Sequence, residues 1–247
     1  MTDSKKKCKN CHSFFEGNYC NNCGQKGDEK RFKLSNITET FIHGFYHVHG
    51  GLFFTMKELF IRPGEMLRGY ISGKRVVYLN PFTYLVLVCL VGGFVYKWSG
   101  IPEHVNEILL ASGETVKFTA KHLSYRVLLT IPTYALMSSF IYKSFNYNYA
   151  EHLIISTFLM SQSMVFMIMG MLLGSFLKPD ELVFEILYYG SFLSIIIYQI
   201  VVLFRLFNEG NITMRWLKAS IASISGLGLS FILMDYIVRF IVFFQGL

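Results

Sequence analysis

Charged residues are scarce in this chain of 247 residues: Asp, Glu, Lys and Arg make up 16% of it, where about 25% is usual. Proline is also rare, at 5 residues, whereas apolar residues reach 53% and Phe alone contributes 24. A soluble domain of this size needs more polar surface to cover its core. The composition therefore excludes a disordered chain, a disulfide-rich miniprotein and a typical cytosolic enzyme, and it indicates a polytopic membrane protein.

The motifs of common enzyme classes are absent as well. The sequence contains no Gly-x-Ser-x-Gly elbow, no phosphate-binding Gly-Lys-Ser/Thr loop and no His-Glu-x-x-His. The neighbours Glu151 and His152 have side chains suited to acid–base chemistry, but adjacent residues on a helix point about 100° apart. The sequence therefore offers no catalytic residue.

The N-terminal segment lacks the apolar stretch of a signal peptide, because residues 1–33 are polar. We therefore expect this segment to stay in a reducing compartment, where cysteines bind metals more readily than they form disulfides. Four of the five cysteines lie there, at Cys8, Cys11, Cys20 and Cys23. The fifth, Cys89, lies in an apolar run and is expected to pack as a small hydrophobic side chain.

The spacing Cys-x2-Cys-x8-Cys-x2-Cys predicts a structural zinc ribbon. Two cysteines separated by two residues bind one ion from a tight turn, and two such turns supply four tetrahedral ligands. Gly24, directly after Cys23, suits a turn that needs φ > 0. Four thiolates leave no open position for a catalytic water, so Zn²⁺ here would fold the segment. A redox pair, or His12 as a competing ligand, is the alternative.

Three zones follow one another along the chain. Residues 1–33 form the ribbon head, residues 34–78 an interfacial segment, and residues 79–247 a transmembrane domain. The last zone contains five apolar runs, each close to or above the 17–25 residues that cross a bilayer. These runs predict an all-α membrane protein with about five spans, at Leu79–Tyr96, Arg126–Tyr142, Leu153–Leu177, Leu182–Phe207 and Ala219–Phe244.

The distribution of positive charge predicts the orientation in the membrane. Of the 23 Lys and Arg residues, 17 fall in segments 1–78, 143–152 and 205–218, which share one side if five helices alternate. Positive residues accumulate on the cytoplasmic side. We therefore expect a cytoplasmic N-terminus and a C-terminus on the outer side.

The interfacial segment combines short amphipathic pieces with basic residues. Ser35 can cap a helix whose apolar face holds Ile37, Phe41, Phe45 and Val48, and a second piece from Leu52 to Phe60 should stop before Pro63. Such helices lie in the membrane surface.

Four basic residues follow and indicate anchoring to phospholipid head groups or, alternatively, a lipid or anion site: Arg62, Arg68, Lys74 and Arg75. No basic helix or aromatic sheet indicates nucleic acid as a partner. His43 and His47 are four residues apart and are expected to pack as polar side chains at the membrane surface. A second metal site is the alternative, because this spacing can bind a metal.

Charged residues within the predicted spans are costly and therefore informative. They include Asp235 and Arg239 in the fifth span, and Glu151 and His152 stand at the opening of the third. Asp235 and Arg239 are four apart and can pair on one helical face, which favours a structural role; substrate passage or a partner interface is the alternative. Small residues in the third and fifth spans indicate faces that pack against other helices, within the chain or from a partner.

The sequence resembles a bacterial family of uncharacterised multi-pass inner-membrane proteins with an N-terminal zinc ribbon, a domain of unknown function. The ribbon ends Cys-Gly-Gln-Lys, and further pieces agree in order: Thr55-x3-Leu59, Pro63, Arg68-Gly-Tyr-Ile71, Gly73-Lys-Arg75, Tyr78, Pro81 and Tyr149-Ala-Glu-His152. The first cysteine pair departs from the common form, because His12 stands where Gly is usual. The resemblance implies location in the bacterial inner membrane and this architecture, and no activity.

Three functions remain open. The first is a non-enzymatic membrane subunit or adaptor, whose ribbon grips a cytoplasmic partner and whose helix bundle joins an inner-membrane assembly. Whichever function holds, other membrane-protein subunits or further copies of the chain are the expected protein partners. The second is a transporter or lipid-handling protein, which needs a polar cavity lined by the charged residues of the spans. The third is a membrane enzyme, which needs acidic residues or histidines converging at one depth.

Overall fold

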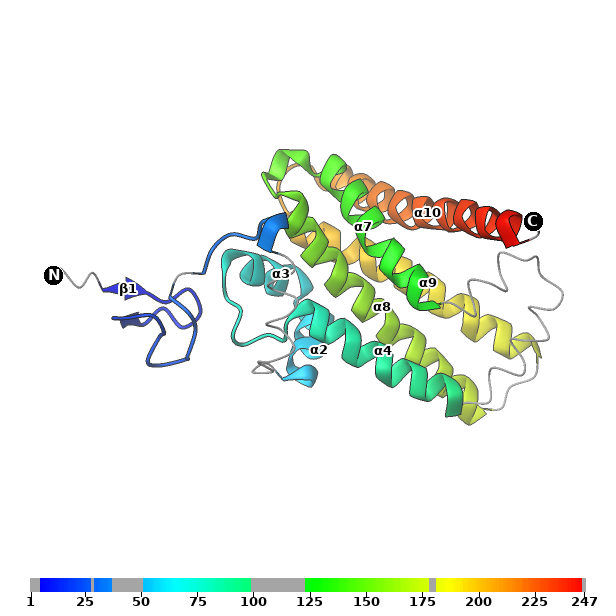
Figure 1. Cartoon of the computed structure of the whole chain (residues 1–247), viewed down its shortest axis with the longest axis horizontal. Coiled ribbons are helices and arrows are strands. Elements are labelled where there is room, and N and C mark those ends of the chain that lie inside the picture. Colours follow the sequence, from blue (N-terminus) through cyan, green and yellow to red (C-terminus); the bar gives the residue numbers. More distant parts are fainter. Residues whose placement is uncertain (1–4, 28, 37–50, 99–122, 178–180, 246–247) are drawn as a thin grey trace.

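The computed structural model describes residues 5–27, 29–36, 51–98, 123–177 and 181–245. Within these ranges the chain is mostly helical (Figure 1). The longest elements are α4 (Pro81–Trp98), α7 (Leu123–Ile141), α8 (Tyr149–Leu177), α9 (Glu181–Leu206) and α10 (Ile212–Gln245).

Each predicted span coincides with one of these helices, so the predicted all-α fold is confirmed. Three helices are long and apolar enough to cross a membrane, over Pro81–Trp98, Tyr149–Phe176 and Ile212–Phe240. Shorter apolar stretches occupy Leu128–Ile141 in α7 and Gly190–Leu206 in α9. The helices indicate a membrane protein, and the count of about five spans is approximate.

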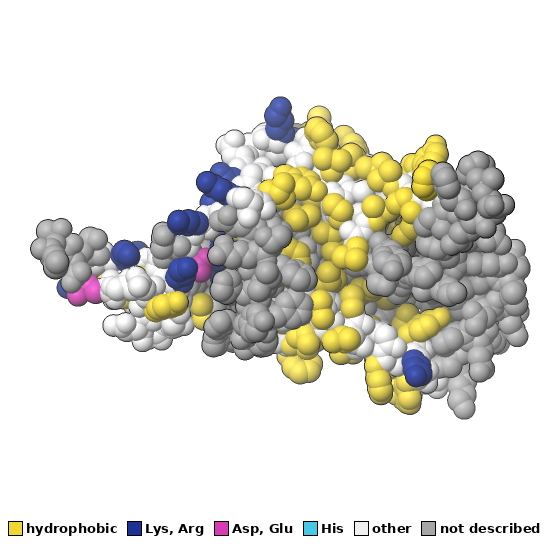
Figure 2. Space-filling view, viewed as in Figure 1, with side chains coloured by type: hydrophobic (Ala, Val, Ile, Leu, Met, Phe, Trp, Pro, Cys, Tyr) yellow, Lys and Arg dark blue, Asp and Glu magenta, His cyan; other side chains and the backbone are white. Residues whose placement is uncertain are grey.

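Helix α8 lies at the centre of the bundle. It packs against α4, α7 and α9, and α10 packs against α7 and α9. Phe158 and Ile154 of α8 are fully buried, as is Tyr134 of α7. The outer surface of the bundle is also apolar: Figure 2 shows hydrophobic side chains spread over it. Such a surface suits lipid rather than water.

A small residue allows α10 to approach α7 closely. A Cβ on Gly226 would lie 2.7 Å from Cδ2 of Tyr134 and 3.1 Å from its Cα. A side chain there would force the two helices apart. The expected contact between small residues of the fifth span and another helix is thus present within the chain.

The short helices α2 (Leu52–Ile61) and α3 (Pro63–Ser72) lie at one end of the bundle. They are separated at Arg62, whose φ of −133° and ψ of 52° interrupt the helix before the proline. Helix α3 packs against α9 and buries Met66 and Leu67 completely, whereas Phe53 of α2 is exposed. The second helix expected in the interfacial segment is therefore present, with α3 added to it. The first expected helix, with Ile37, Phe41, His43, Phe45, His47 and Val48, lies outside the described residues.

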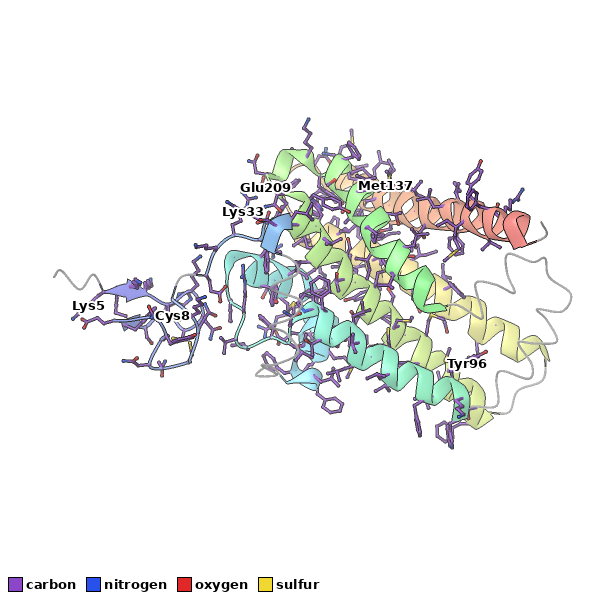
Figure 3. The ribbon with its side chains drawn as sticks, in the orientation of Figure 1. Lys5, Cys8, Lys33, Tyr96, Met137 and Glu209 are labelled. Atoms are coloured by element: carbon purple, nitrogen blue, oxygen red, sulfur yellow. The ribbon has the colours of Figure 1, made fainter. Side chains whose placement is uncertain are left out.

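The N-terminal head and the C-terminal part of α10 lie at opposite ends of the bundle (Figure 1). Figure 3 places Lys33 and Glu209 at the end next to the head, and Tyr96 towards the other end. We call the end of the bundle next to the head the ribbon end. Which membrane side it faces stays a prediction.

Candidate metal centre

The head is a small ribbon built from two similar turns. Strands β1 (Lys6–Lys7) and β2 (Phe14–Phe15) pair antiparallel around the first cysteine pair. In the first turn the His12 amide donates to the Cys8 carbonyl at 3.0 Å, and in the second the Gly24 amide donates to the Cys20 carbonyl at 2.8 Å. The two cysteine pairs therefore sit in matching backbone turns.

The matching turns explain how His12 replaces glycine. Its φ is 62°, and Gly24 at the equivalent place has φ 73°. A residue with a Cβ pays a conformational cost in this left-handed region, of about 1–2 kcal/mol. The first turn thus keeps the geometry of the second at some cost in strain.

The four cysteine sulfurs converge on one point. The Sγ atoms of Cys8, Cys11, Cys20 and Cys23 all lie within 4.8 Å of one another, and the group does not include His12. Two pairs, Cys8 with Cys23 and Cys11 with Cys20, are 3.5 Å apart. This cluster can hold one metal ion with four sulfur ligands.

Local hydrogen bonds prepare one of the sulfurs for metal binding. The Ser13 hydroxyl, 3.4 Å from Sγ of Cys11, lowers the pKa of that thiol to about 5 together with the Ser13 backbone. Burial instead raises the pKa of Cys8 to about 11. Because a metal binds the thiolate, its binding would release a proton from Cys8.

Gln25 fastens the ribbon to the helices. Its side chain is 1% exposed; Nε2 donates to the Gly73 carbonyl at 2.8 Å, and Oε1 accepts from the Arg75 amide at 3.1 Å. Gly73 ends α3 with φ 112°, a conformation that favours glycine. The turn after the last cysteine therefore docks against the turn after α3.

Arg75 makes a second link beside Gln25. Its Nη1 donates to Oε2 of Glu29 at 2.6 Å, and its guanidinium lies 3.7 Å from the centre of the Phe32 ring. Phe32 is buried and stacks on Tyr70 of α3 at 5.8 Å. The chain that follows the ribbon is thus held against α3 by an ion pair, a cation–π contact and ring stacking.

Arg31 makes a third link, to the start of α8. Its Nε and Nη2 donate to the two carboxylate oxygens of Glu151 at 2.7 and 2.8 Å, and Nη2 also contacts the Asn146 carbonyl. The Glu151 carboxylate accepts from the Asn148 amide, and Asn148 Oδ1 accepts from the Glu151 amide, which forms a capping box. Glu151 therefore caps α8 and binds the chain leaving the ribbon.

The four basic residues predicted to bind lipid or an anion do not share one place. Arg62 pairs with Glu58, Arg68 donates to the carbonyls of Arg205 and Leu206 at the end of α9, and Lys74 lies 6.0 Å from the Tyr78 ring centre. Only Arg75 of the four lies among other basic side chains lining the cavity described below.

The charged residues of the spans are also dispersed. His152 is fully buried, with Nδ1 2.9 Å from the Ser138 hydroxyl. Asp235 and Arg239 pair at 2.8 Å, as predicted from their spacing, and the Arg239 side chain is 75% exposed. Asp235 lies 23 residues after the start of α10 at Ile212, about 35 Å along the helix. The two pairs therefore do not line a common cavity among the described residues.

Sequence reasoning missed the residues that join the ribbon to the bundle. Gln25, Glu29 and Arg31 have partners 46 to 120 positions away, and no local pattern marks such pairs. One signal was readable: Asn148-x-x-Glu151 has the spacing of a capping box at the start of α8.

Together, a four-cysteine cluster and a bundle of apolar helices define a helical membrane protein whose head can hold a metal. Residues 49–92 match a protein family described as "Protein of unknown function (DUF3667)". The matched stretch includes α2, α3 and much of α4, and with them the turn that receives Gln25. No curated protein and no solved structure matches the chain.

Proposed function

We propose that the protein is a non-enzymatic adaptor of the bacterial inner membrane, with its zinc ribbon on the cytoplasmic side. The ribbon would bind another membrane-protein subunit, and the helix bundle would hold it at the phospholipid bilayer. The observation that carries the proposal is the attachment of the ribbon to the bundle through the side chains of Gln25, Arg31 and Arg75. A head fixed in this way presents its outer surface in one orientation, which an adaptor requires.

We infer that the metal in the cysteine cluster is zinc. A tetrahedral site with Zn–S bonds of about 2.3 Å places its sulfurs about 3.8 Å apart. The separations of 3.5 Å in two of the sulfur pairs are close to this value, and all four sulfurs lie within 4.8 Å of one another. Four sulfur ligands close the coordination sphere, which supports a structural rather than a catalytic ion.

The ribbon carries exposed aromatic side chains that suit a protein partner. Phe14 is 69% exposed and Tyr19 is 61% exposed, although both belong to a small polar head. Aromatic residues are enriched in protein interfaces, where they bury large areas. We therefore assign the contact with the partner subunit to these two residues.

The test is gentle detergent extraction at native expression, followed by mass spectrometry of the proteins that co-elute. We expect defined membrane subunits at a fixed ratio with the wild type, and their loss with Phe14→Ser/Tyr19→Ser. Lys6→Ser/Lys7→Ser changes exposed residues of the same ribbon and is the matched control. Elution alone, or as a homo-oligomer that carries lipid, would reject the adaptor and favour lipid handling.

A further inference from the structure

A basic cavity lies where the ribbon meets the bundle. It has a volume of about 340 Å³. Its charged lining consists of Lys9 from the ribbon, Lys30 and Arg31 from the chain that follows, Arg75 from the turn after α3, and Glu151 from α8. Figure 2 shows Lys and Arg side chains gathered beside this junction. Four cations from three segments of the chain thus surround one cavity.

Cations outnumber carboxylates around the cavity among the described residues. Glu151 pairs with Arg31, and Glu29 pairs with Arg75. Four cations therefore stand beside two carboxylates among the described residues. Like charges held together destabilise a fold unless an anion neutralises them.

The two arginines are held in place before any ligand arrives. Arg31 is fixed by both oxygens of Glu151, and Arg75 by Glu29, the Lys30 carbonyl and the Phe32 ring. The Arg75 Nε is buried and has no hydrogen-bond acceptor among the described residues. Binding to fixed groups costs less conformational entropy than binding to mobile ones.

Lys9 contributes a charge from the ribbon itself. Its chain passes over Gly73, where a Cβ would lie 2.7 Å from Lys9 Cδ, and its ammonium donates to the Glu29 carbonyl at 2.6 Å. The ribbon and the turn after α3 therefore build the cavity jointly. A ligand bound there would contact both.

We propose that this cavity binds a phosphate group, carried either by the head group of an anionic phospholipid or by a soluble phosphate compound. A phosphate monoester carries about −1.5 to −2 charges at pH 7 and three acceptor oxygens, which suits a lining in which cationic side chains outnumber carboxylates. Arginine and lysine both bind phosphate oxygens through charged hydrogen bonds. The cavity lies at the ribbon end of the apolar bundle, so both sources can reach it.

The test uses the full-length, metal-loaded protein in nanodiscs of neutral phosphatidylcholine. Inorganic phosphate is titrated in one arm, and nanodiscs containing phosphatidic acid replace the neutral ones in the other. Saturable binding of inorganic phosphate, read by a shift in thermal unfolding, indicates a soluble ligand. A shift with phosphatidic acid alone indicates a lipid head group. No shift in either arm overturns the proposal.

Two double variants separate the cavity from general charge. Lys9→Gln/Lys30→Gln removes two charges of the lining, whereas Lys7→Gln/Lys26→Gln removes two exposed charges of the ribbon outside it. We expect the first to weaken binding about tenfold or more and the second less than about twofold. Equal losses would reject a specific cavity.

A labelling experiment on the wild type gives an independent readout that does not depend on any variant folding. Amine acetylation followed by mass spectrometry should slow at Lys9 and Lys30 when the ligand is present, and stay unchanged at Lys7 and Lys26. Unchanged labelling at all four lysines would contradict the proposal. The adaptor function is tested by co-eluting subunits, so either proposal can fail without the other.

Discussion

The side-chain amide of Gln25 donates a hydrogen bond of 2.8 Å to the carbonyl of Gly73, across 48 positions of sequence. Gln25 comes two residues after the last cysteine, and Gly73 is the residue at which α3 ends. The bond therefore connects the candidate metal centre with the first helices of the bundle. The ribbon and the turn after α3 are thus in direct contact.

Replacing Gln25 should loosen the ribbon from the bundle. Gln25→Ala leaves the buried carbonyl of Gly73 and the amide of Arg75 without their partner, which costs about 2 kcal/mol or more. We expect faster hydrogen exchange in residues 73–76 and faster proteolysis between ribbon and α2. Glu16→Ala, at an exposed position of the same ribbon, is the control. Equal exchange rates in both variants would show that Gln25 does not hold the ribbon.

The ion pair between Arg31 and Glu151 should show coupling in a double-mutant cycle. The Glu151 side chain is 3% exposed, so Arg31→Ala leaves a buried carboxylate without its cation. Adding Glu151→Gln removes that charge and should recover part of the lost stability, with a coupling of about 1–2 kcal/mol. Thermal unfolding in detergent measures it. Lys33→Ala, an exposed neighbour, should change little, and purely additive effects would contradict the pairing.

Metal removal should unfold the ribbon and spare the helices. We expect one zinc per chain by elemental analysis in the wild type and in Cys89→Ser, and none in Cys8→Ser/Cys20→Ser. A strong chelator should broaden only the NMR signals of the ribbon. The bound ion supplies the folding free energy of such small domains, whereas the helices do not depend on it. Unchanged zinc content in the double variant would reject the four-cysteine site.

The strain at His12 gives a sharper test of the turn geometry. His12→Gly removes the cost of a left-handed residue and should keep or raise zinc affinity, whereas His12→Val should lower it, because branched side chains tolerate this conformation poorly. Competition with a chelating dye measures both affinities. Retained affinity in the glycine variant also shows that the imidazole is not a ligand; loss of zinc there would show the reverse.

The close approach of α10 and α7 predicts different effects at two neighbouring glycines. A Cβ at Gly226 meets Tyr134 at 2.7 Å, whereas a Cβ at Gly228 meets nothing within 4 Å. Gly226→Ala should therefore destabilise the bundle by about 1–3 kcal/mol, and Gly228→Ala should be near neutral. Thermal unfolding in the same detergent compares them. Similar stability of the two variants would contradict the packing of these helices.

The sequence by itself determined the elements whose signal is local. Five apolar runs predicted five helices, because a membrane span must satisfy its backbone hydrogen bonds within the segment. The cysteine spacing predicted a four-sulfur cluster, because each pair of cysteines closes its own turn. Even the substitution of His12 for glycine leaves the turn intact, since the hydrogen bond to Cys8 sets it.

Only the tertiary structure decided which polar residues meet. Arg68 is a basic residue of the same predicted group as Arg75, yet it caps α9 while Arg75 lines the basic cavity. Glu151, predicted at the opening of the third span, binds Arg31 of the chain that follows the ribbon. Gln25 carries no mark of its role. Such partners lie 46 to 138 positions apart, so they are set by how helices and ribbon pack. The periodicity or spacing of residues along the chain indicates local structure, and it does not indicate which distant residues come into contact.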